Sequence, residues 1–518
     1  MLKAQYFVKR TLSQNLNVPD MQNKIALQVK ILLLAAFFTF VFNKQFIGLN
    51  LLLFETAVLL IIAQKLKWKF ESRLMQILFA RTCISCLFSV INGASFAIAI
   101  NIISAVVLVG YVYFPAAQSL VTAIINSASN VFTAQYNFYL NMVSAEFRYF
   151  NFRKIISVLK IGAIPIAIIG LFLLMYKLSN PVFEEKVNHA AFFLNDILIW
   201  FFERVEISTI GLFVLGTAIS NFILLSSAGN VAEQYQLGKT DVLTSNVDAE
   251  QRSFVVKNEL AAGVFLLLAL NAMLLIVNVI DIKWVWLPFV WEGEYLKQFV
   301  HEGTHLLIVT ILISVVIILY FFRGEINFYS KNKFLKVLSI LWLAQNFILA
   351  MSVAMRNIRY IEHFALAYKR IGVIIFLIIV LIGITTVIMK VIKKKSPFYL
   401  FKINALSVYV VLIVASLFNW DTIIAKYNFA NYTHSFVHYD FLSELPDKCL
   451  PYLDKSKEEL IEIDKAQKNI LAKEGYYMSA EEYSSIIEKR KARFIKEYEK
   501  RSFLSWNYAE YDAYNKLK

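Results

Sequence analysis

The sequence from Ser339 to Asn428 decides the fold. It begins ILWLAQNFILAMSVAMRNIRYIEHFALAYKRIG (residues 340–372) and, after a further apolar run, ends VIKKKSPFYLFKINALSVYVVLIVASLFNWDTIIAKYN (residues 391–428). Three long apolar segments alternate here with two short basic segments. A helix of about 20 apolar residues crosses the ~30 Å hydrocarbon core of a bilayer. The stretch therefore predicts consecutive membrane-spanning helices joined by charged hinges.

The composition of the whole chain supports the same interpretation. Of its 518 residues, 58% are apolar and only 17% are charged, which lies outside the range of ordinary soluble domains. A formal net charge of +15 could suggest nucleic-acid binding, but the segment from Asp440 onward holds 15 Lys or Arg and 16 Asp or Glu. The excess positive charge thus belongs to the membrane part, where basic loops are expected on the cytoplasmic side. We expect no nucleic-acid partner.

Eleven apolar segments can be interpreted as spans. We predict an all-α fold, a polytopic transmembrane helix bundle of about eleven spans (ten to twelve), with a small helical C-terminal extramembrane domain. The predicted spans lie near residues 27–43, 46–63, 74–92, 95–114, 155–176, 207–228, 259–280, 304–322, 334–354, 371–391 and 403–420.

The loop charges predict the orientation of the bundle. With the N-terminus inside, the cytoplasmic segments together contain 24 Lys or Arg and the opposite loops contain 10. Such an asymmetry is typical of a chain with basic loops retained in the cytoplasm. We therefore expect a cytoplasmic N-terminus and an external C-terminus.

Two further segments are predicted to be helical outside the spans. Residues 115–150 mix apolar and polar side chains and indicate an amphipathic helix against the inner membrane surface. The tail after Asn428 alternates charged and apolar positions, and Ser479 with Glu482 forms a capping box that predicts a helix start. This tail should form a helical, water-facing unit.

One short motif could carry metal chemistry. His301-Glu302-Gly303-Thr304-His305 is an H-E-x-x-H, which on a helix places both His on one face with Glu302 as general base. It would make the protein a zinc-dependent intramembrane hydrolase. However, a third ligand is not evident, and the Asn-Pro and Leu-Asp-Gly signature of site-2-type intramembrane proteases is absent.

A cluster of charges at the ends of three spans is the second candidate site. Arg356 ends one span, Lys369 and Arg370 begin the next, and Asp421 ends the last. Charges near hydrocarbon must pair with one another or face a water-filled cavity. Two alternatives remain open: a salt-bridged cap that fixes the three helices, or an anion or headgroup site to which Tyr360 also contributes.

Polar residues inside the spans form a third group of candidates. Glu55 and Arg81 fall on adjacent spans and could neutralise each other. Gln345 and Asn346 are expected to bridge helices rather than to bind substrate.

The stretch that decides the fold resembles a bacterial membrane family described only as a domain of unknown function (the DUF4153/4173 group). The resemblance covers roughly residues 250–455, and it departs from the family pattern where Ala365 and Ala367 replace Gly and Thr and where Lys426 replaces Arg. It implies a multi-pass protein of the bacterial cytoplasmic membrane, but no activity. The matching positions are Trp342, Gln345, Asn346, Arg356, Tyr360, Tyr368, Lys369, Arg370, Asn419, Trp420, Asp421, Tyr427 and Asn428.

With that resemblance the chain divides into four parts. These are a basic cytoplasmic segment (1–30), an N-terminal membrane half with amphipathic connections (31–257), a family-like membrane core (258–428) and a helical water-facing C-terminal domain (429–518).

We expect a non-enzymatic, transporter-like or scaffolding protein without a cofactor. Its partners would be the lipid bilayer, an anionic lipid or solute, and a protein bound through residues 440–518. Transport predicts a water-accessible polar cavity, scaffolding a packed core with an exposed partner surface, and the alternative hydrolase a third ligand near His301 and His305. The candidate binding residues are Arg356, Tyr360, Tyr368, Lys369, Arg370, Trp420, Asp421 and Asn346.

Overall fold

The computed structural model is built from helices. It describes residues 21–518 except 71, 145–164, 166–167, 176–177, 179–205, 246–248, 288–292 and 472–477. Over these residues no β-strand forms, and one isolated bridge joins Val242 and Lys395. The predicted all-α class is confirmed.

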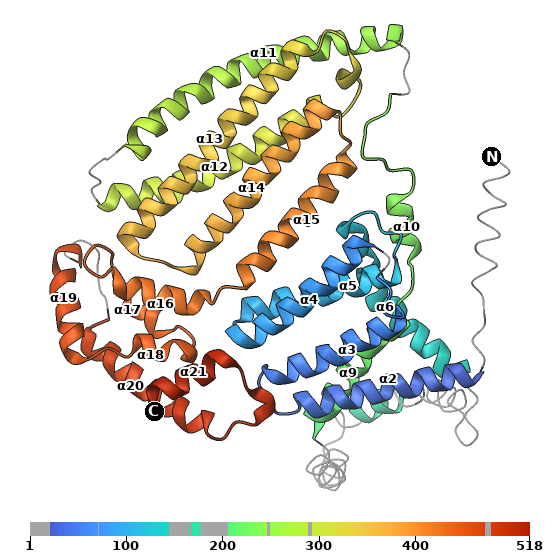
Figure 1. Ribbon diagram of the computed structural model, residues 1–518, viewed down its shortest axis with the longest axis vertical. Coiled ribbons are helices and arrows are strands. Elements are labelled where there is room, and N and C mark those ends of the chain that lie inside the picture. The colour runs from blue at the N-terminus through green and yellow to red at the C-terminus, as the bar shows by residue number, and fades with distance from the viewer. Residues whose placement is uncertain are drawn as a thin grey trace.

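The first group of helices packs around one hydrophobic core (Figure 1). Helix α2 lies along α9, α4 along α5, and α5 along α6. The bounds are α2 Met21–Phe42, α3 Leu49–Lys65, α4 Arg73–Asn92, α5 Ser95–Tyr113, α6 Leu120–Ser144, α9 Ile207–Leu225 and α10 Asn230–Gln236.

Helix α6 corresponds to the predicted amphipathic segment, but it is part of the bundle. The Asn126 side chain donates to the carbonyl of Gly110 at 3.0 Å, and the Ser127 hydroxyl donates to that of Val106 at 2.7 Å. Its polar face therefore binds the backbone of α5 rather than facing only water.

The second group surrounds helix α13, which packs against α11, α12 and α14 (Figure 1). Helix α15 continues the layer and contacts α4, α5 and α6, so it joins the two groups. The bounds are α11 Ala249–Asp281, the π-helix η1 Ile282–Trp286, α12 Gly293–Phe321, the 3₁₀-helix η2 Glu325–Phe328, α13 Lys333–Phe364, α14 Tyr368–Lys393 and α15 Pro397–Ser416.

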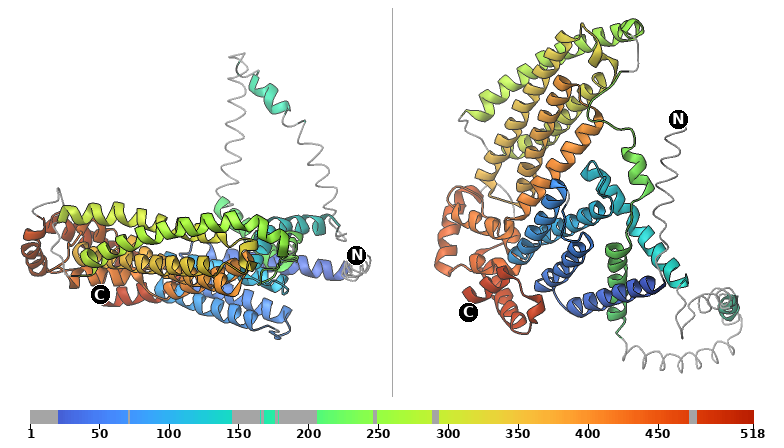
Figure 2. Two further views of the ribbon diagram at one scale, coloured as in Figure 1. Left: turned by 90° about the horizontal axis from the view of Figure 1, so that it is seen from above. Right: turned by 45° about the vertical axis from the view of Figure 1, so that its right-hand side comes forward.

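The C-terminal helices gather at one end of the bundle, as both views of Figure 2 show. Their core buries Leu442, Cys449, Tyr483 and Phe494. The predicted capping box is confirmed at α20, where the Ser479 side chain accepts from the Glu482 amide at 3.1 Å. The bounds are α16 Trp420–Ala430, α17 Tyr439–Ser443, η3 Asp447–Cys449, α18 Leu450–Leu453, α19 Lys457–Leu471, α20 Ala480–Tyr498, η4 Phe503–Ser505 and α21 Tyr508–Leu517.

The C-terminal helices also contact the first group of helices. The Leu49 amide at the start of α3 donates to the Trp506 carbonyl at 2.8 Å. Gly93 ends α4 in the left-handed region with φ of 53°, and a Cβ there would come within 2.7 Å of the Asn507 side chain. Only glycine suits both the backbone angle and this close approach.

Eight helices in the described part of the chain are long and apolar enough to cross a membrane. Three predicted spans are not among them, for different reasons. Helix α3 covers the span predicted at 46–63 but has 17 residues, the apolar part of α12 is the short segment Leu306–Phe321, and the span predicted at 155–176 falls mostly outside the described residues. The polytopic architecture is confirmed, with fewer full-length spans among these residues than the eleven predicted.

Candidate functional site

Arg356 forms a buried ion pair, but not with the acid that the sequence suggested. Its guanidinium lies 2.5 Å from the carboxylate of Asp281, and the two side chains are only 6% and 4% exposed. The expected neighbour was Asp421. Because α13 packs lengthwise along α11, Arg356 meets the last residue of α11 instead. A buried charge requires a partner of opposite sign, and Asp281 supplies it.

A series of hydrogen bonds continues along the same two helices. The Gln345 side chain donates to Asn271 at 2.8 Å, and the Asn278 side chain donates to the Gln345 carbonyl at 3.1 Å. Farther along, the Trp286 indole donates to Ser352 at 3.0 Å. On α13 the bonded residues Gln345 and Ser352 are seven positions apart, and on α11 so are Asn271 and Asn278. Seven residues is the repeat of helices packed side by side. The prediction that Gln345 bridges helices is confirmed.

Asn346 does not bridge helices through its amide nitrogen. That group donates to the Trp342 carbonyl in its own helix at 2.8 Å. Asn346 is fully buried in the interior of the bundle, ten residues before Arg356 in the sequence. It is thus separate from the charged cluster at the helix end.

Asp421 lies at the centre of a second network. Its carboxylate is 2.6 Å from the Lys448 ammonium group and accepts a short hydrogen bond from the Tyr368 hydroxyl. The Lys448 group also donates to the carbonyls of Asn92 and Gly93 at 2.9 and 3.1 Å. Since the Lys448 side chain is only 2% exposed, one buried cation connects η3, α16 and the end of α4.

Arg370 binds the hinge between α13 and α14. It donates to the Phe364 carbonyl at 2.7 Å and to the Ala365 carbonyl, and its guanidinium lies 4.6 Å from the centre of the Tyr360 ring. Ala365 has φ of 62°, a backbone conformation that favours glycine. Arg370 therefore stabilises a strained turn.

The remaining candidates differ in their surroundings. The Trp420 indole donates to the Ala415 carbonyl at 2.8 Å, which closes the turn between α15 and α16. Lys369 is exposed.

The structure thus brings most predicted residues to one end of the bundle, where they form three separate interactions. We call this end the charged junction, consisting of Asp281, Arg356, Tyr360, Tyr368, Arg370, Asp421 and Lys448.

Sequence reasoning missed two residues of the junction, Asp281 and Lys448. Each lies in a segment that itself resembles the family, ELAAGVFLLLALNAMLLIVNVIDI and YDFLSELPDKCLPYL. Asp281 is the first acidic residue after a long apolar run, and an acid at the end of a predicted span was the available signal. Lys448 follows the membrane part and had no such signal.

The suggested pairing of Glu55 with Arg81 is wrong. The buried Glu55 carboxylate accepts from the Asn101 side chain at 2.5 Å, and Asn101 in turn accepts from the Ser85 hydroxyl at 2.6 Å. The Arg81 guanidinium lies 5.9 Å from the centre of the Tyr409 ring, on α15. Helix α4 therefore directs Ser85 toward α5 and Arg81 toward α15.

The H-E-x-x-H motif falls on α12, so its two His are indeed four residues apart on a helix. The side chains of His301, Glu302 and His305 lie outside the described part of the structure. Among the residues whose side chains are described, no group of three or more His, Cys, Asp or Glu could hold a metal ion.

Together, the fold and the junction define a polytopic, all-helical membrane protein. The chain matches the family described as a domain of unknown function (DUF4153) over residues 29–456, and it belongs to this family. The match extends well before residue 250, so the first group of helices is also part of the family architecture. It ends immediately before α19. No curated protein and no solved structure matches the chain.

Proposed function

We propose that the protein is a non-enzymatic membrane scaffold, in which the bundle holds the C-terminal domain (429–518) in position to bind a partner protein. The observation that carries this proposal is the bonding of Lys448. Its ammonium group contacts Asp421 and the backbone of Asn92 and Gly93. A buried cation of η3 whose partners lie on α16 and at the end of α4 favours one fixed arrangement of these elements, because any movement would leave the charge without its partners.

The other charged groups of the junction support a structural role in the same way. Arg356 is bound by Asp281, and Arg370 by backbone carbonyls and Tyr360. An anion entering here would have to compete with these internal partners. The junction is therefore better suited to fixing helices than to binding a solute that must be released.

The proposed partner surface is the outer face of α20. This face exposes side chains of both signs, including Glu488, Lys489, Arg493 and Lys496. The opposite face buries Tyr483, Ile487 and Phe494 in the domain core. Exposed charges of mixed sign fit a partner with a complementary polar surface, since such pairs mainly give specificity.

Site-specific photo-crosslinking in cells tests the proposal. A photoreactive amino acid at Ser485 or Ala492, both exposed on α20, should form an adduct with one discrete protein. The same group at Ile313, an exposed apolar position on α12, is the matched control and should give no protein adduct. Reversing the charges of Glu488 and Arg493 should abolish the adduct at Ala492. Absence of an adduct at both α20 positions, or an adduct unaffected by charge reversal, would contradict the proposal.

The alternative function, a zinc-dependent intramembrane hydrolase, is tested by metal content. We expect purified protein to contain no stoichiometric zinc, and a His301→Ala/His305→Ala variant to match it in zinc content and stability. About one zinc ion per chain, lost in the variant, would overturn the scaffold proposal, because a catalytic site keeps zinc through several protein ligands.

A further inference from the structure

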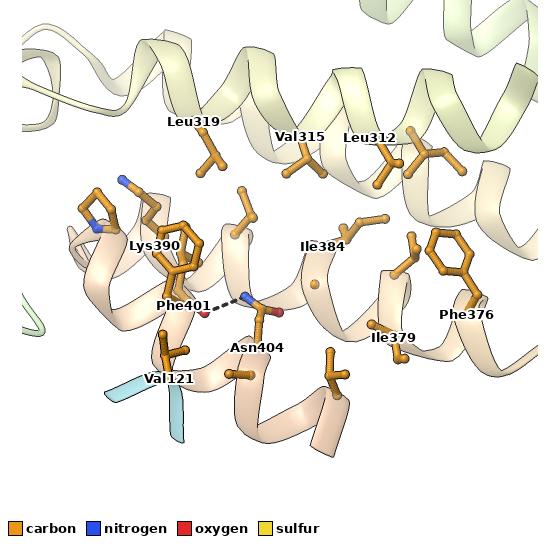
Figure 3. A pocket seen from close by; sticks show the side chains of 18 of the residues that line it. Val121, Leu312, Val315, Leu319, Phe376, Ile379, Ile384, Lys390, Phe401 and Asn404 are labelled. Atoms are coloured by element: carbon orange, nitrogen blue, oxygen red, sulfur yellow. Dashed lines mark hydrogen bonds between the residues drawn. The ribbon is translucent and has the colours of Figure 1, made fainter. Parts of the chain in front are cut away.

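At the end of the bundle opposite the charged junction, an apolar cavity opens between α12, α14 and α15. Its volume is about 530 Å³. Figure 3 shows Leu312, Val315 and Leu319 of α12 facing Ile384 of α14 and Phe401 of α15 across the space. The lining is almost entirely aliphatic and aromatic, so water is a poor occupant, whereas a hydrocarbon chain would fill it.

A cation lies at one end of this apolar space. Lys390 lines the cavity (Figure 3), and its ammonium group donates to the Phe322 carbonyl at 2.7 Å. The ion pairs among the described residues include none to Lys390, whereas nearby Arg323 is paired with Glu259 at 3.2 Å. The segment 390–402 contains five Lys and no acidic residue. This end of the cavity therefore carries positive charge that the adjoining loop does not neutralise.

A second, more polar cavity of about 590 Å³ adjoins the first. The two share Val121, Pro397 and Phe401 as lining residues, and the second adds Lys239 and Thr244. One of its walls is the segment after α10, which crosses the turn between α14 and α15. There the Leu243 amide donates to the Lys394 carbonyl at 2.9 Å.

An acid in the segment that lines this second cavity already has a partner. Asp241 accepts from Lys402 at 3.1 Å. Lys239 lies 3.5 Å from the centre of the Tyr235 ring, and the ion pairs among the described residues do not include it. An apolar compartment thus continues into a cationic one, an arrangement that matches a molecule with a hydrocarbon chain and an anionic head.

We propose that these two cavities bind one anionic phospholipid, with an acyl chain between α12, α14 and α15 and the phosphate headgroup in the second cavity, near Lys239. Basic pockets between membrane helices on the cytoplasmic side bind such headgroups. This end of the bundle carries the Lys-rich turn 390–402, which the loop charges predict to be cytoplasmic. The site is separate from the charged junction and independent of the scaffold proposal.

Two glycines of α14 provide a matched pair of variants. Gly383 lines the apolar cavity, and a Cβ there would meet only Asn404, at 3.7 Å. Gly372 is on the same helix outside the cavity, with nothing within 4 Å of its Cβ position. Leucine should be accommodated at either position because the backbone is helical, but only Gly383→Leu fills the cavity. Lys239→Gln removes a lining cation, and Lys331→Gln removes an exposed cation at the same end.

Native mass spectrometry of the full chain tests the proposal. The protein is released from detergent after incubation with phosphatidylglycerol or with phosphatidylcholine of the same acyl chains. We expect one retained phosphatidylglycerol per chain and at least tenfold less phosphatidylcholine. Retention should fall about tenfold in Gly383→Leu and severalfold in Lys239→Gln, and should be unchanged in Gly372→Leu and Lys331→Gln.

Three outcomes would overturn the proposal. Equal retention of phosphatidylglycerol and phosphatidylcholine would show that the site does not select an anionic headgroup. Equal loss in Gly383→Leu and Gly372→Leu, or no loss in either, would assign the bound lipid to the general surface of the bundle. Equal loss in the two lysine variants would reduce the charge effect to overall electrostatics. Thermal unfolding of each variant, compared with the parent, confirms that the comparison uses folded protein.

Discussion

The two ends of the bundle treat their charges differently. At the charged junction, Arg356 is neutralised by Asp281 and Lys448 by Asp421, each pair at 2.6 Å or less. At the opposite end, the turn 390–402 contains five Lys and no acid. Lys402 is paired with Asp241 from another segment, and Lys390 is bound by a backbone carbonyl. One end has paired its charges within the chain, and the other has positive charge left to interact with something outside it.

The difference indicates what each end does. A buried ion pair costs desolvation energy, but it favours the one arrangement of helices in which both charges are paired. The junction is therefore suited to fixing helices in one geometry. Cations without acidic partners at the membrane surface attract anionic lipids, each worth about 1 kcal/mol near the surface. The following predictions test whether the junction is as rigid as its pairing implies.

The largest effect is expected from Arg356→Leu. The substitution leaves the Asp281 carboxylate buried without its cation, which should lower the free energy of unfolding by about 3–5 kcal/mol. The double variant Arg356→Leu/Asp281→Leu, which removes both charges, should recover most of this loss. Unfolding in mixed micelles measures both. If Arg356→Leu left the free energy of unfolding unchanged, the pair would not hold α11 against α13. The same would follow if the double variant were no more stable than Arg356→Leu.

A smaller and more local loss is expected from Lys448→Met. It removes one charged hydrogen-bond donor from Asp421, Asn92 and Gly93, and Asp421 keeps the Tyr368 hydroxyl. A charge-assisted bond contributes about 1.5–3 kcal/mol, and we expect a loss of this size. Hydrogen exchange should accelerate at residues 440–453 and at the end of α4, while α11 and α13 stay protected. Unchanged exchange at the end of α4 would show that Lys448 does not connect the domain to the bundle.

The contrast between Arg356 and Lys448 also shows what the sequence could predict. Hydropathy and span length placed Arg356, Tyr368, Arg370 and Asp421 at the same end of the bundle, because those properties depend on the order of the segments along the chain. The pairing could not be derived, since Arg356 and Asp281 are 75 residues apart. Which helices are neighbours depends on side-chain packing. The same limit explains why Glu55 was assigned to Arg81 rather than to Asn101.

Cys449 offers a direct reporter of the junction. Its side chain is fully buried beside Asp421, and burial, followed by the Asp421 charge, raises the pKa of the thiol to about 12. At pH 8 the thiol is therefore protonated as well as inaccessible, and only the thiolate reacts with maleimides. In a Cys83→Ala/Cys86→Ala background we expect at least a hundredfold slower labelling than in unfolded protein.

Lys448→Met in the same background should increase the rate of Cys449 labelling severalfold. Arg356→Leu should increase it less, when both variants are measured at one temperature at which they remain folded. Fast labelling of the parent protein at pH 8 would contradict the buried position of Cys449. Equal labelling in the two variants would contradict the separation of the junction into two networks.

The smallest expected effect is a gain in stability at the hinge. Ala365 has φ of 62° and ψ of −170°, a region that costs a residue with a Cβ about 1–3 kcal/mol. Ala365→Gly relieves this strain, but it loses a buried methyl group and adds backbone freedom to the unfolded chain, worth roughly 0.5–1 kcal/mol. We expect a net stabilisation of about 1 kcal/mol, measured by unfolding in mixed micelles. Ala367→Gly is the matched control: with φ of −146° that position carries no such strain, so the substitution should destabilise. If Ala365→Gly destabilised the protein as much as this control, the hinge would not be strained, and Arg370 would have no strained turn to hold.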